Sequence, residues 1–284
     1  MIKKVSEITF NDTIYSIMSI ISDYHIHTKL CGHAIGELSE YADQAIKTGL
    51  KEIGISDHAP LVSHENPEIT MSFYDLPVYH KMIEALKSEY SGKLLIKFGI
   101  EADFIEGYED KTKAILDAYP YDYVIGSVHY VDMWGFDNPD EQDKWKEKKI
   151  SSVYRAYHEN LQKCALSGMY DIMGHVDLVK KYGHRPDEDI TAVVEETARV
   201  FKESNVAIEI NTSGLRKPVG EIYPSLSDLK IYCAAGIPIV FGSDSHAPNQ
   251  VGCDYDKALI YAGSAGYKEY ALFKERKIDS MVGL

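Results

Sequence analysis

The 284-residue sequence has few cysteines, no excess of positive charge and no long apolar run. Its four cysteines are far apart and form no C-x-x-C pair, which argues against a disulfide framework or a zinc ribbon and is typical of reduced thiols in a cytoplasm. The formal net charge of -14, from 44 acidic and 30 basic residues, makes binding to a phosphate backbone unfavourable. We therefore expect no nucleic acid as a partner.

The apolar segments are too short for a membrane span or a signal peptide. The stretch 14–21 is far below the roughly 20 residues that a bilayer requires. Charges at Glu7 and Asp12 interrupt the segment before it, which therefore lacks the apolar region of a signal peptide. These features predict a soluble, cytoplasmic protein without a membrane partner, and nothing in the sequence specifies an oligomeric state.

Short apolar, β-branched runs alternate with longer amphipathic stretches, a pattern typical of repeated strand–helix units around a parallel sheet. Seven strands are predicted, at 20–28, 52–58, 94–103, 121–130, 171–177, 206–212 and 238–246. Seven helices are predicted after them, at 37–48, 76–90, 109–118, 153–167, 188–203, 225–235 and 255–263. The tail 269–281 alternates weakly and is predicted to form an edge strand or a hairpin. The fold class is therefore α/β, and the length suits one TIM-like barrel.

Three histidines mark the first predicted strand and the loop after it. Successive side chains of a strand point to opposite faces, so His25 and His27 share one face and can hold one metal ion. His33 lies on the following loop. This local pattern predicts a metal site.

Histidines and carboxylates recur at the ends of the later predicted strands. Nine residues qualify as metal ligands: His25, His27, His33, His58, Glu101, His129, His175, Asp244 and His246. In a barrel the carboxyl ends of all strands meet at one mouth. A lone histidine at a strand end is ordinarily a hydrogen-bonded residue, but seven of the 11 histidines at one end are not explained in this way. Nine side chains exceed the four or five ligands of one zinc ion and suit three divalent metals.

Other residues near the strand ends have weaker interpretations. Asp57 and Asp177 adjoin candidate ligands and can orient an imidazole, although a helix cap explains each equally well. Cys31 lies beside His33 but is interpreted as a small packed thiol.

Two motifs resemble a known family. The run 27–34, H-T-x-x-C-x-H-A, and the run 211–216, N-T-S-G-L-R, look like the histidinol-phosphatase branch of the PHP (polymerase and histidinol phosphatase) superfamily. The resemblance covers nearly the whole chain after Ile20. It implies a distorted (β/α)7 barrel of the PHP type at 20–284, and the segment 1–19 is an N-terminal extension that such a barrel does not need.

The resemblance also implies an activity and a ligand set. The activity is that of a phosphoric monoester hydrolase, which converts L-histidinol phosphate to L-histidinol and phosphate in histidine biosynthesis. Three divalent ions are implied, usually Zn²⁺ and sometimes Mn²⁺ or Fe²⁺. Their implied ligands are His25, His27, Glu101 and Asp244 for the first, His33, His58 and His246 for the second, and Glu101, His129 and His175 for the third. A hydroxide bridging the first two ions would attack the phosphorus.

Three residues are predicted to act in catalysis, namely Asp244, His246 and Arg216. Asp244 or a metal-bound water can supply the proton that the leaving group needs. Arg216 and Lys180 are predicted to bind substrate, Arg216 because its guanidinium offers a bidentate fork to phosphate. Lys181 and Arg185 are weaker candidates of the same kind.

Three alternatives remain open at the level of sequence. Another PHP phosphoesterase, acting on a nucleotide or a different small phosphate ester, would use the same ligands. An amidohydrolase-type deaminase also begins with an H-x-H strand, but it uses fewer metals and often a carbamylated lysine. A metal-bound regulatory module without turnover would be expected to have lost some ligands, and here the set is complete.

Overall fold

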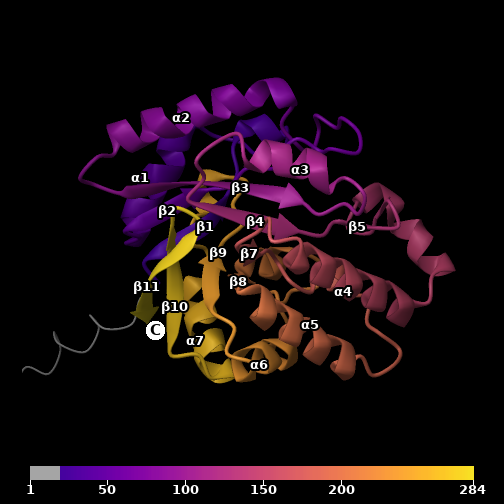
Figure 1. The fold of residues 1–284 in the computed structure, drawn as a ribbon. Coiled ribbons are helices and arrows are strands. Elements are labelled where there is room, and N and C mark those ends of the chain that lie inside the picture. Colours follow the sequence, from indigo (N-terminus) through magenta and orange to yellow (C-terminus); the bar gives the residue numbers. More distant parts are fainter. Residues whose placement is uncertain (1–19) are drawn as a thin grey trace, which may run out of the picture.

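Seven parallel strands form a nearly closed barrel in the computed structural model, which describes residues 20–284 (Figure 1). The predicted N-terminal extension 1–19 lies outside the described residues. The strands are paired in the order β1 (Ser22–Ile26), β2 (Glu52–Ile55), β3 (Leu95–Asp103), β4 (Tyr123–Ser127), β7 (Ile172–Met173), β8 (Ala207–Asn211) and β9 (Ile239–Gly242). This order confirms the predicted α/β barrel and all seven predicted strands.

The strands end earlier than predicted at the mouth of the barrel. β7 was expected at 171–177 and β9 at 238–246, but both stop before a residue with left-handed backbone. The φ angle is +24° at His175 and +51° at Asp244. L-residues other than glycine adopt such angles rarely, and functional sites are where they cluster. The turns divert the chain out of the sheet just where the predicted ligands lie.

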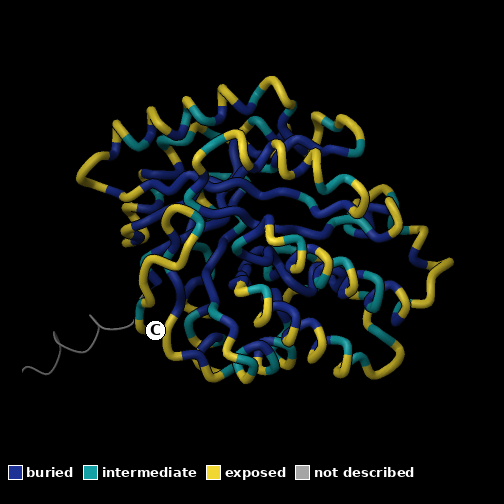
Figure 2. The backbone as a smooth tube through the Cα atoms, in the orientation of Figure 1, coloured by how far each residue is buried: buried dark blue, intermediate teal, exposed yellow. Residues whose placement is uncertain are grey.

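Helices cover the outside of the barrel, and Figure 2 shows the resulting contrast between buried strands and partly exposed helices. They are α1 (Leu38–Thr48), α2 (Leu76–Glu89), α3 (Glu109–Leu116), α4 (Ile150–Leu166), α5 (Thr191–Ser204), α6 (Leu226–Ala234) and α7 (Tyr255–Ala265). All seven predicted helices are confirmed, with bounds shifted by three residues or fewer at each end. Across residues 20–284, no helix combines the length and apolar character that crossing a membrane requires.

The barrel has a seam between β1 and β9, where strand pairing is sparse. One parallel bridge joins Ile26 to Ser245, and the amide of His27 donates to the carbonyl of Ser245 at 2.9 Å. Nearer the start of β1, the buried Asp23 carboxylate spans the seam. It accepts hydrogen bonds from the Ser243 amide at 3.0 Å and the Gly252 amide at 3.0 Å. A side chain thus replaces part of the missing strand ladder.

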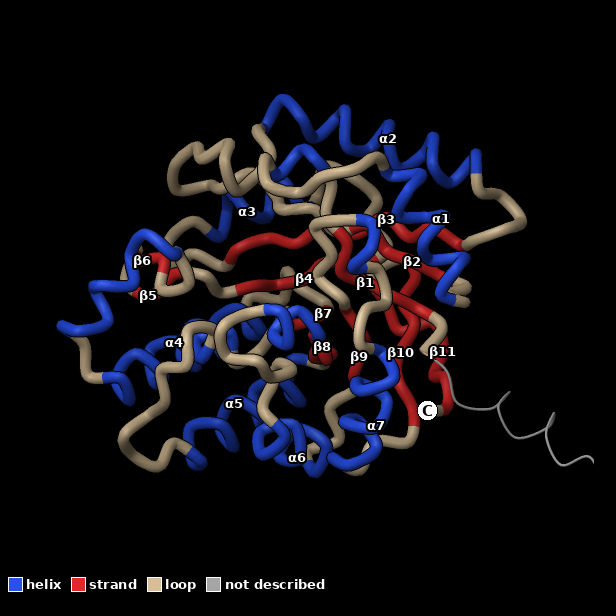
Figure 3. Tube along the Cα trace, turned by 180° about the vertical axis from the view of Figure 1, so that it is seen from behind, coloured by secondary structure: helices blue, strands red, loops and turns tan. Residues whose placement is uncertain are grey.

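The tail forms the predicted hairpin, which fills the end of the barrel at which the parallel strands begin. β10 (Glu269–Lys274) pairs antiparallel with β11 (Lys277–Gly283). Phe273 is buried against Tyr24 inside the barrel, and its amide donates to the Tyr24 hydroxyl at 2.8 Å. The short pair β5 (Tyr130–Val131) and β6 (Trp134–Gly135) lies at the opposite end (Figures 1 and 3). The hairpin therefore lies at the end of the barrel opposite to the one that carries the predicted ligands.

A buried histidine away from the mouth makes the stability of the fold depend on pH. His158 on α4 is 1% exposed, and burial lowers its pKa to about 4. Between pH 6.5 and 4 the unfolded chain binds the proton and the folded chain does not, so stability falls as pH falls, by about 3 kcal/mol in total. In urea unfolding at several pH values, we expect the His158→Asn variant to lack this share of the pH dependence. A pH dependence equal to that of the unaltered protein would contradict the assignment.

Candidate metal centre

The nine predicted metal ligands lie where the barrel strands end and their loops begin. His25 and Glu101 are within β1 and β3. The other seven follow strand ends: His27 and His33 after β1, His58 after β2, His129 after β4, His175 after β7, and Asp244 and His246 after β9. Because the strands are parallel, all nine positions fall at the same end of the barrel.

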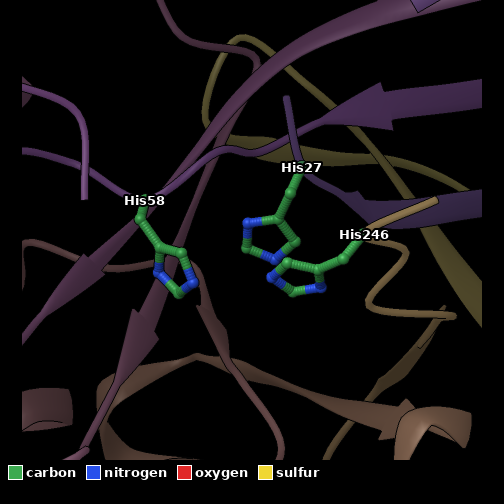
Figure 4. A group of neighbouring side chains, drawn as sticks. All are labelled: His27, His58 and His246. Atoms are coloured by element: carbon green, nitrogen blue, oxygen red, sulfur yellow. The ribbon is translucent and has the colours of Figure 1, made fainter. Parts of the chain in front are cut away.

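One group of rings joins the two sides of the seam. Ligand atoms of His27, His58 and His246 lie within 4.8 Å of one another, and Figure 4 shows the three rings converging. The ring centroid of His27 is 4.0 Å from that of His246 and 4.4 Å from that of His58. His33 adjoins the group, with its ring 4.5 Å from that of His246. The residues expected to share the second ion are thus neighbours, with His27 beside them.

Two further groups made up only of predicted ligands satisfy the same 4.8 Å limit. They are His25 with His27 and Asp244, and Glu101 with His129 and His175. The second of these corresponds to the expected ligands of the third ion, and the first to those of the first ion without Glu101.

Glu101 occupies the middle of the site and touches each side of it. Its Oε2 atom is 3.2 Å from Nε2 of His25 and 2.9 Å from Nδ1 of His58. Its Oε1 atom is 2.9 Å from Nε2 of His175 and accepts a hydrogen bond from the Ser127 hydroxyl at 2.5 Å. A carboxylate placed between imidazoles of two groups has the geometry needed to bridge two ions.

The buried polar atoms of the site lack hydrogen-bond partners within the described part of the protein. These atoms are Nε2 of His25, Nδ1 and Nε2 of His27, Oε2 of Glu101, Nδ1 of His175 and Nε2 of His246. Burying a polar atom without a partner costs about 1–3 kcal/mol, so such a concentration needs an explanation. Imidazole nitrogens and carboxylate oxygens are the atoms that bind Zn²⁺ and similar ions. The residues present therefore fit divalent metals.

The electrostatics of the site favour positive charge. Burial by itself would lower the pKa of His25, but the carboxylates of Glu209 and Glu101 outweigh burial and raise that pKa well above its usual range. For Glu101, burial alone would raise the pKa, yet His58 and His25 hold it well below its usual range. Glu101 is therefore ionised, and the cluster attracts cations.

Three carboxylates lie behind the ligand histidines. Oδ1 of Asp103 is 2.8 Å from Nδ1 of His129, and Oε1 of Glu209 is 2.7 Å from Nδ1 of His25. Oδ1 of Asp57 is 3.4 Å from Nδ1 of His27. In the first two pairs the carboxylate is hydrogen-bonded to one ring nitrogen and so directs the other nitrogen towards a metal.

Two of these contacts differ from what the sequence suggested. Glu209 was not predicted, although an ionisable residue inside the apolar strand run 206–211 is a signal that could have found it. Asp57 adjoins His27 rather than only its chain neighbour His58. Asp177, the other residue proposed to orient an imidazole, instead binds Lys180 at 2.8 Å and accepts from the Ser225 amide at 3.0 Å.

Cys31 is buried at the edge of the site. Its thiol donates to the carbonyl of Thr28 at 3.1 Å, as expected of a packed thiol. Its sulfur atom also lies within 4.8 Å of ligand atoms of His33 and His246. The sequence had assigned it no contact with the metal ligands.

The two residues predicted to bind substrate occupy different environments. Arg216 follows β8, its Nη2 donates to the carbonyl of Ser243 at 2.5 Å, and its Nη1 is buried without a partner among the described residues. Lys180 is fully buried, and its ammonium is bound by the carbonyl of Ile222 at 3.0 Å and by Asp177. The Lys180 ammonium is therefore bound by the protein's own oxygens, and its assignment to substrate stays a prediction.

A second basic side chain lies closer to the mouth. Nζ of Lys181 binds Oδ2 of Asp137 at 2.9 Å. Lys181 therefore ties the long connection after β4 to the loop after β7. Burial lowers the pKa of the neighbouring Lys217, which is also influenced by the charges of Asp244, Lys181 and Arg216.

Comparisons with known proteins show which family the sequence resembles. The sequence matches the family model of the PHP domain over residues 23–213. It is 37% identical to a probable histidinol-phosphatase of Deinococcus radiodurans, over 92% of this chain and 100% of that protein, and 34% identical to the histidinol-phosphatase of Bacillus subtilis, over 84% and 97%. A solved structure of histidinol phosphate phosphatase from Lactococcus lactis, complexed with zinc, L-histidinol and phosphate, superposes with a TM-score of 0.80 at 26% identity, over 93% of this chain and 100% of that one.

Proposed function

The chain belongs to the PHP domain family, among its histidinol-phosphatases, and from this premise we propose that its metal centre hydrolyses L-histidinol phosphate to L-histidinol and phosphate. The observation that carries the proposal is the convergence of nine ligand side chains, five of which hold buried nitrogens or oxygens without a hydrogen-bond partner among the described residues. The zinc, L-histidinol and phosphate bound by the Lactococcus lactis enzyme support the same substrate here. The step belongs to histidine biosynthesis.

We propose three divalent ions, with Zn²⁺ as the resident metal and the ligand sets implied by the resemblance. When bound, such ions activate a hydroxide nucleophile at neutral pH and neutralise the charge of a phosphate group. Glu101 is positioned to hold two of them, because it contacts both His25 and His175. Three dications against the carboxylates of Glu101 and Asp244 leave a charge of about +4, which attracts a phosphate dianion.

Arg216 is proposed as the phosphate clamp. Its Nη2 is anchored on the Ser243 carbonyl beside Asp244, which leaves Nη1 as a donor without a partner among residues 20–284. The Asp244 carbonyl is 3.4 Å from Nη2 of Arg216, and Oδ1 of Asp244 is 3.4 Å from Nδ1 of His246. We assign to Asp244 or a metal-bound water the proton that the alkoxide leaving group takes up. Lys181 and Lys217 add positive charge on the same side.

Substrate preference tests the proposed function. We expect the zinc-loaded protein to release phosphate from L-histidinol phosphate much faster than from a nucleotide or p-nitrophenyl phosphate, with metal content measured on the same sample. Faster release from the nucleotide would favour a different PHP phosphoesterase.

The four free thiols support a cytoplasmic location for the enzyme.

The Arg216→Ala variant tests the clamp. A hydrogen bond to a charged group contributes about 1.5–3 kcal/mol, so KM should rise by roughly 10- to 100-fold while metal content stays unchanged. Arg216→Lys should recover little of this, because an ammonium cannot supply the planar fork. Arg199→Ala, on the exposed side of α5, is the matched control for loss of one positive charge. An unchanged KM in Arg216→Ala would remove Arg216 from the phosphate site.

A further inference from the structure

Glu209 carries a buried carboxylate beneath the metal centre. No contact of this carboxylate with substrate is predicted. The residue lies on β8 with 1% of its surface exposed, so its charge is removed from water. A buried carboxylate is costly unless its oxygens accept several hydrogen bonds. The partners of its two oxygens therefore indicate why the fold retains it.

The two oxygens of Glu209 bind two different strand ends. Oε1 is 2.7 Å from Nδ1 of His25, at the end of β1. Oε2 accepts from the backbone amide of His175 at 2.7 Å, after β7, and from the Asn211 side chain at 3.0 Å. One carboxylate thus holds a side chain on one side of the mouth and a main-chain turn on another.

Each bond fixes a ligand in the orientation that a metal needs. Because a carboxylate accepts hydrogen bonds, His25 donates from Nδ1, and Nε2 is then the nitrogen on which a metal ion would take the place of the other ring proton. That Nε2 atom is buried without a partner, 3.2 Å from Glu101. The bond to the His175 amide stabilises the left-handed turn, with φ of +24°, that directs the His175 ring toward Glu101.

The neighbouring strand leaves room for this carboxylate. A Cβ atom on Gly242 of β9 would overlap Oε1 of Glu209 and would lie 2.8 Å from Cβ of His25. Gly242 has an ordinary φ angle, so the backbone conformation does not require glycine there. The absence of a side chain at position 242 of β9 is therefore explained by the position of Glu209.

We propose that Glu209 is a positioning residue that sets the geometry of two metal sites at once, the one that includes His25 and the one that includes His175. This inference rests on the proposed metal centre and extends it to a residue outside the ligand set. By comparison, Asp103 contacts the ring of His129 alone. Loss of Glu209 should therefore weaken the binding of more than one ion, whereas loss of Asp103 should weaken the binding of only one.

The test compares zinc binding in four variants, by metal analysis and by competition with a chromophoric chelator, without substrate. Glu209→Ala removes the acceptor and should weaken zinc binding by about 10- to 100-fold at two ions. Glu209→Gln keeps one amide oxygen for His25 but cannot accept with both atoms, so an intermediate affinity is expected. If the alanine variant does not fold, the glutamine variant carries the test.

Two controls separate positioning from general stability. Glu52→Gln changes another buried barrel glutamate, which accepts from the Tyr24 hydroxyl at the far end, and should leave zinc affinity unchanged. Asp103→Asn should weaken a single ion. Zinc binding by Glu209→Gln within twofold of the unaltered protein, or an equal loss in Glu52→Gln, would overturn the proposal. Failure of fully zinc-loaded protein to hydrolyse L-histidinol phosphate would count against the substrate and not against Glu209.

Discussion

Replacing Glu101 by Gln is expected to lower kcat/KM for L-histidinol phosphate by about 10³-fold or more and to reduce the bound metal per chain. An amide of the same size keeps the hydrogen bond from Ser127 but loses the charge that faces His25, His58 and His175. Metal ions contribute several kcal/mol to stabilising the transition state of phosphate hydrolysis, and each 1.36 kcal/mol is tenfold in rate. Loss of correctly placed ions therefore has a larger effect than loss of one hydrogen bond to substrate.

The measurement combines metal analysis with steady-state kinetics on the same preparation. Restoring activity with excess Zn²⁺ or Mn²⁺ should succeed only in part, since an amide nitrogen replaces one of the two oxygens that face the ion groups. Glu195→Gln changes an exposed residue of α5. It is the control for loss of a negative charge and should keep full activity. Normal metal content with normal kcat/KM in Glu101→Gln would show that Glu101 does not bridge ions.

Replacing Asp23 by Ala is expected to lower the free energy of unfolding by about 4 kcal/mol, which corresponds to about 10 °C in Tm for a protein of this size. The carboxylate is fully buried and accepts from the amides of Ser243 and Gly252 across the seam. Alanine leaves these amides without an acceptor, and no strand ladder replaces it there. Asp23→Asn should lose less, because its amide oxygen still accepts.

Thermal unfolding of chelator-treated protein measures this effect without a contribution from bound metal. Asp117→Ala is the matched control, since its carboxylate pairs with Lys113 on the surface and is 61% exposed. Such exposed pairs contribute about 0–1 kcal/mol. A loss in Asp23→Ala no larger than in Asp117→Ala would mean that the barrel seam does not depend on this side chain.

The order of elements could be predicted because most barrel strands are largely apolar runs and most of the helices between them are amphipathic. The ends of β7 and β9 could not, because the residue pattern gives no sign that the backbone turns left-handed at His175 and Asp244. Such turns depend on tertiary bonds, such as the one from Glu209 to the His175 amide. Sequence periodicity carries no information about those bonds.

The candidate ligands could be predicted because histidine and carboxylate are uncommon at strand ends and appear there repeatedly. Lys180 and Lys181 show where this reasoning ends. The two residues are neighbours in the same turn. Lys180 is fully buried and binds the Ile222 carbonyl and Asp177, whereas Lys181 binds Asp137. Which of two neighbouring lysines faces the mouth depends on the turn geometry that the sequence does not specify.

The seam between β1 and β9 has a thermodynamic consequence. His25 and His27 stand on one edge of it and Asp244 on the other, so an ion shared by these residues joins both edges. Binding to the folded state alone stabilises a protein by mass action, by about 4 kcal/mol when the free ion exceeds its dissociation constant a thousandfold. The closure of the barrel and the supply of metal in the cell are then linked, and the same ions that serve the chemistry also set the population of intact enzyme.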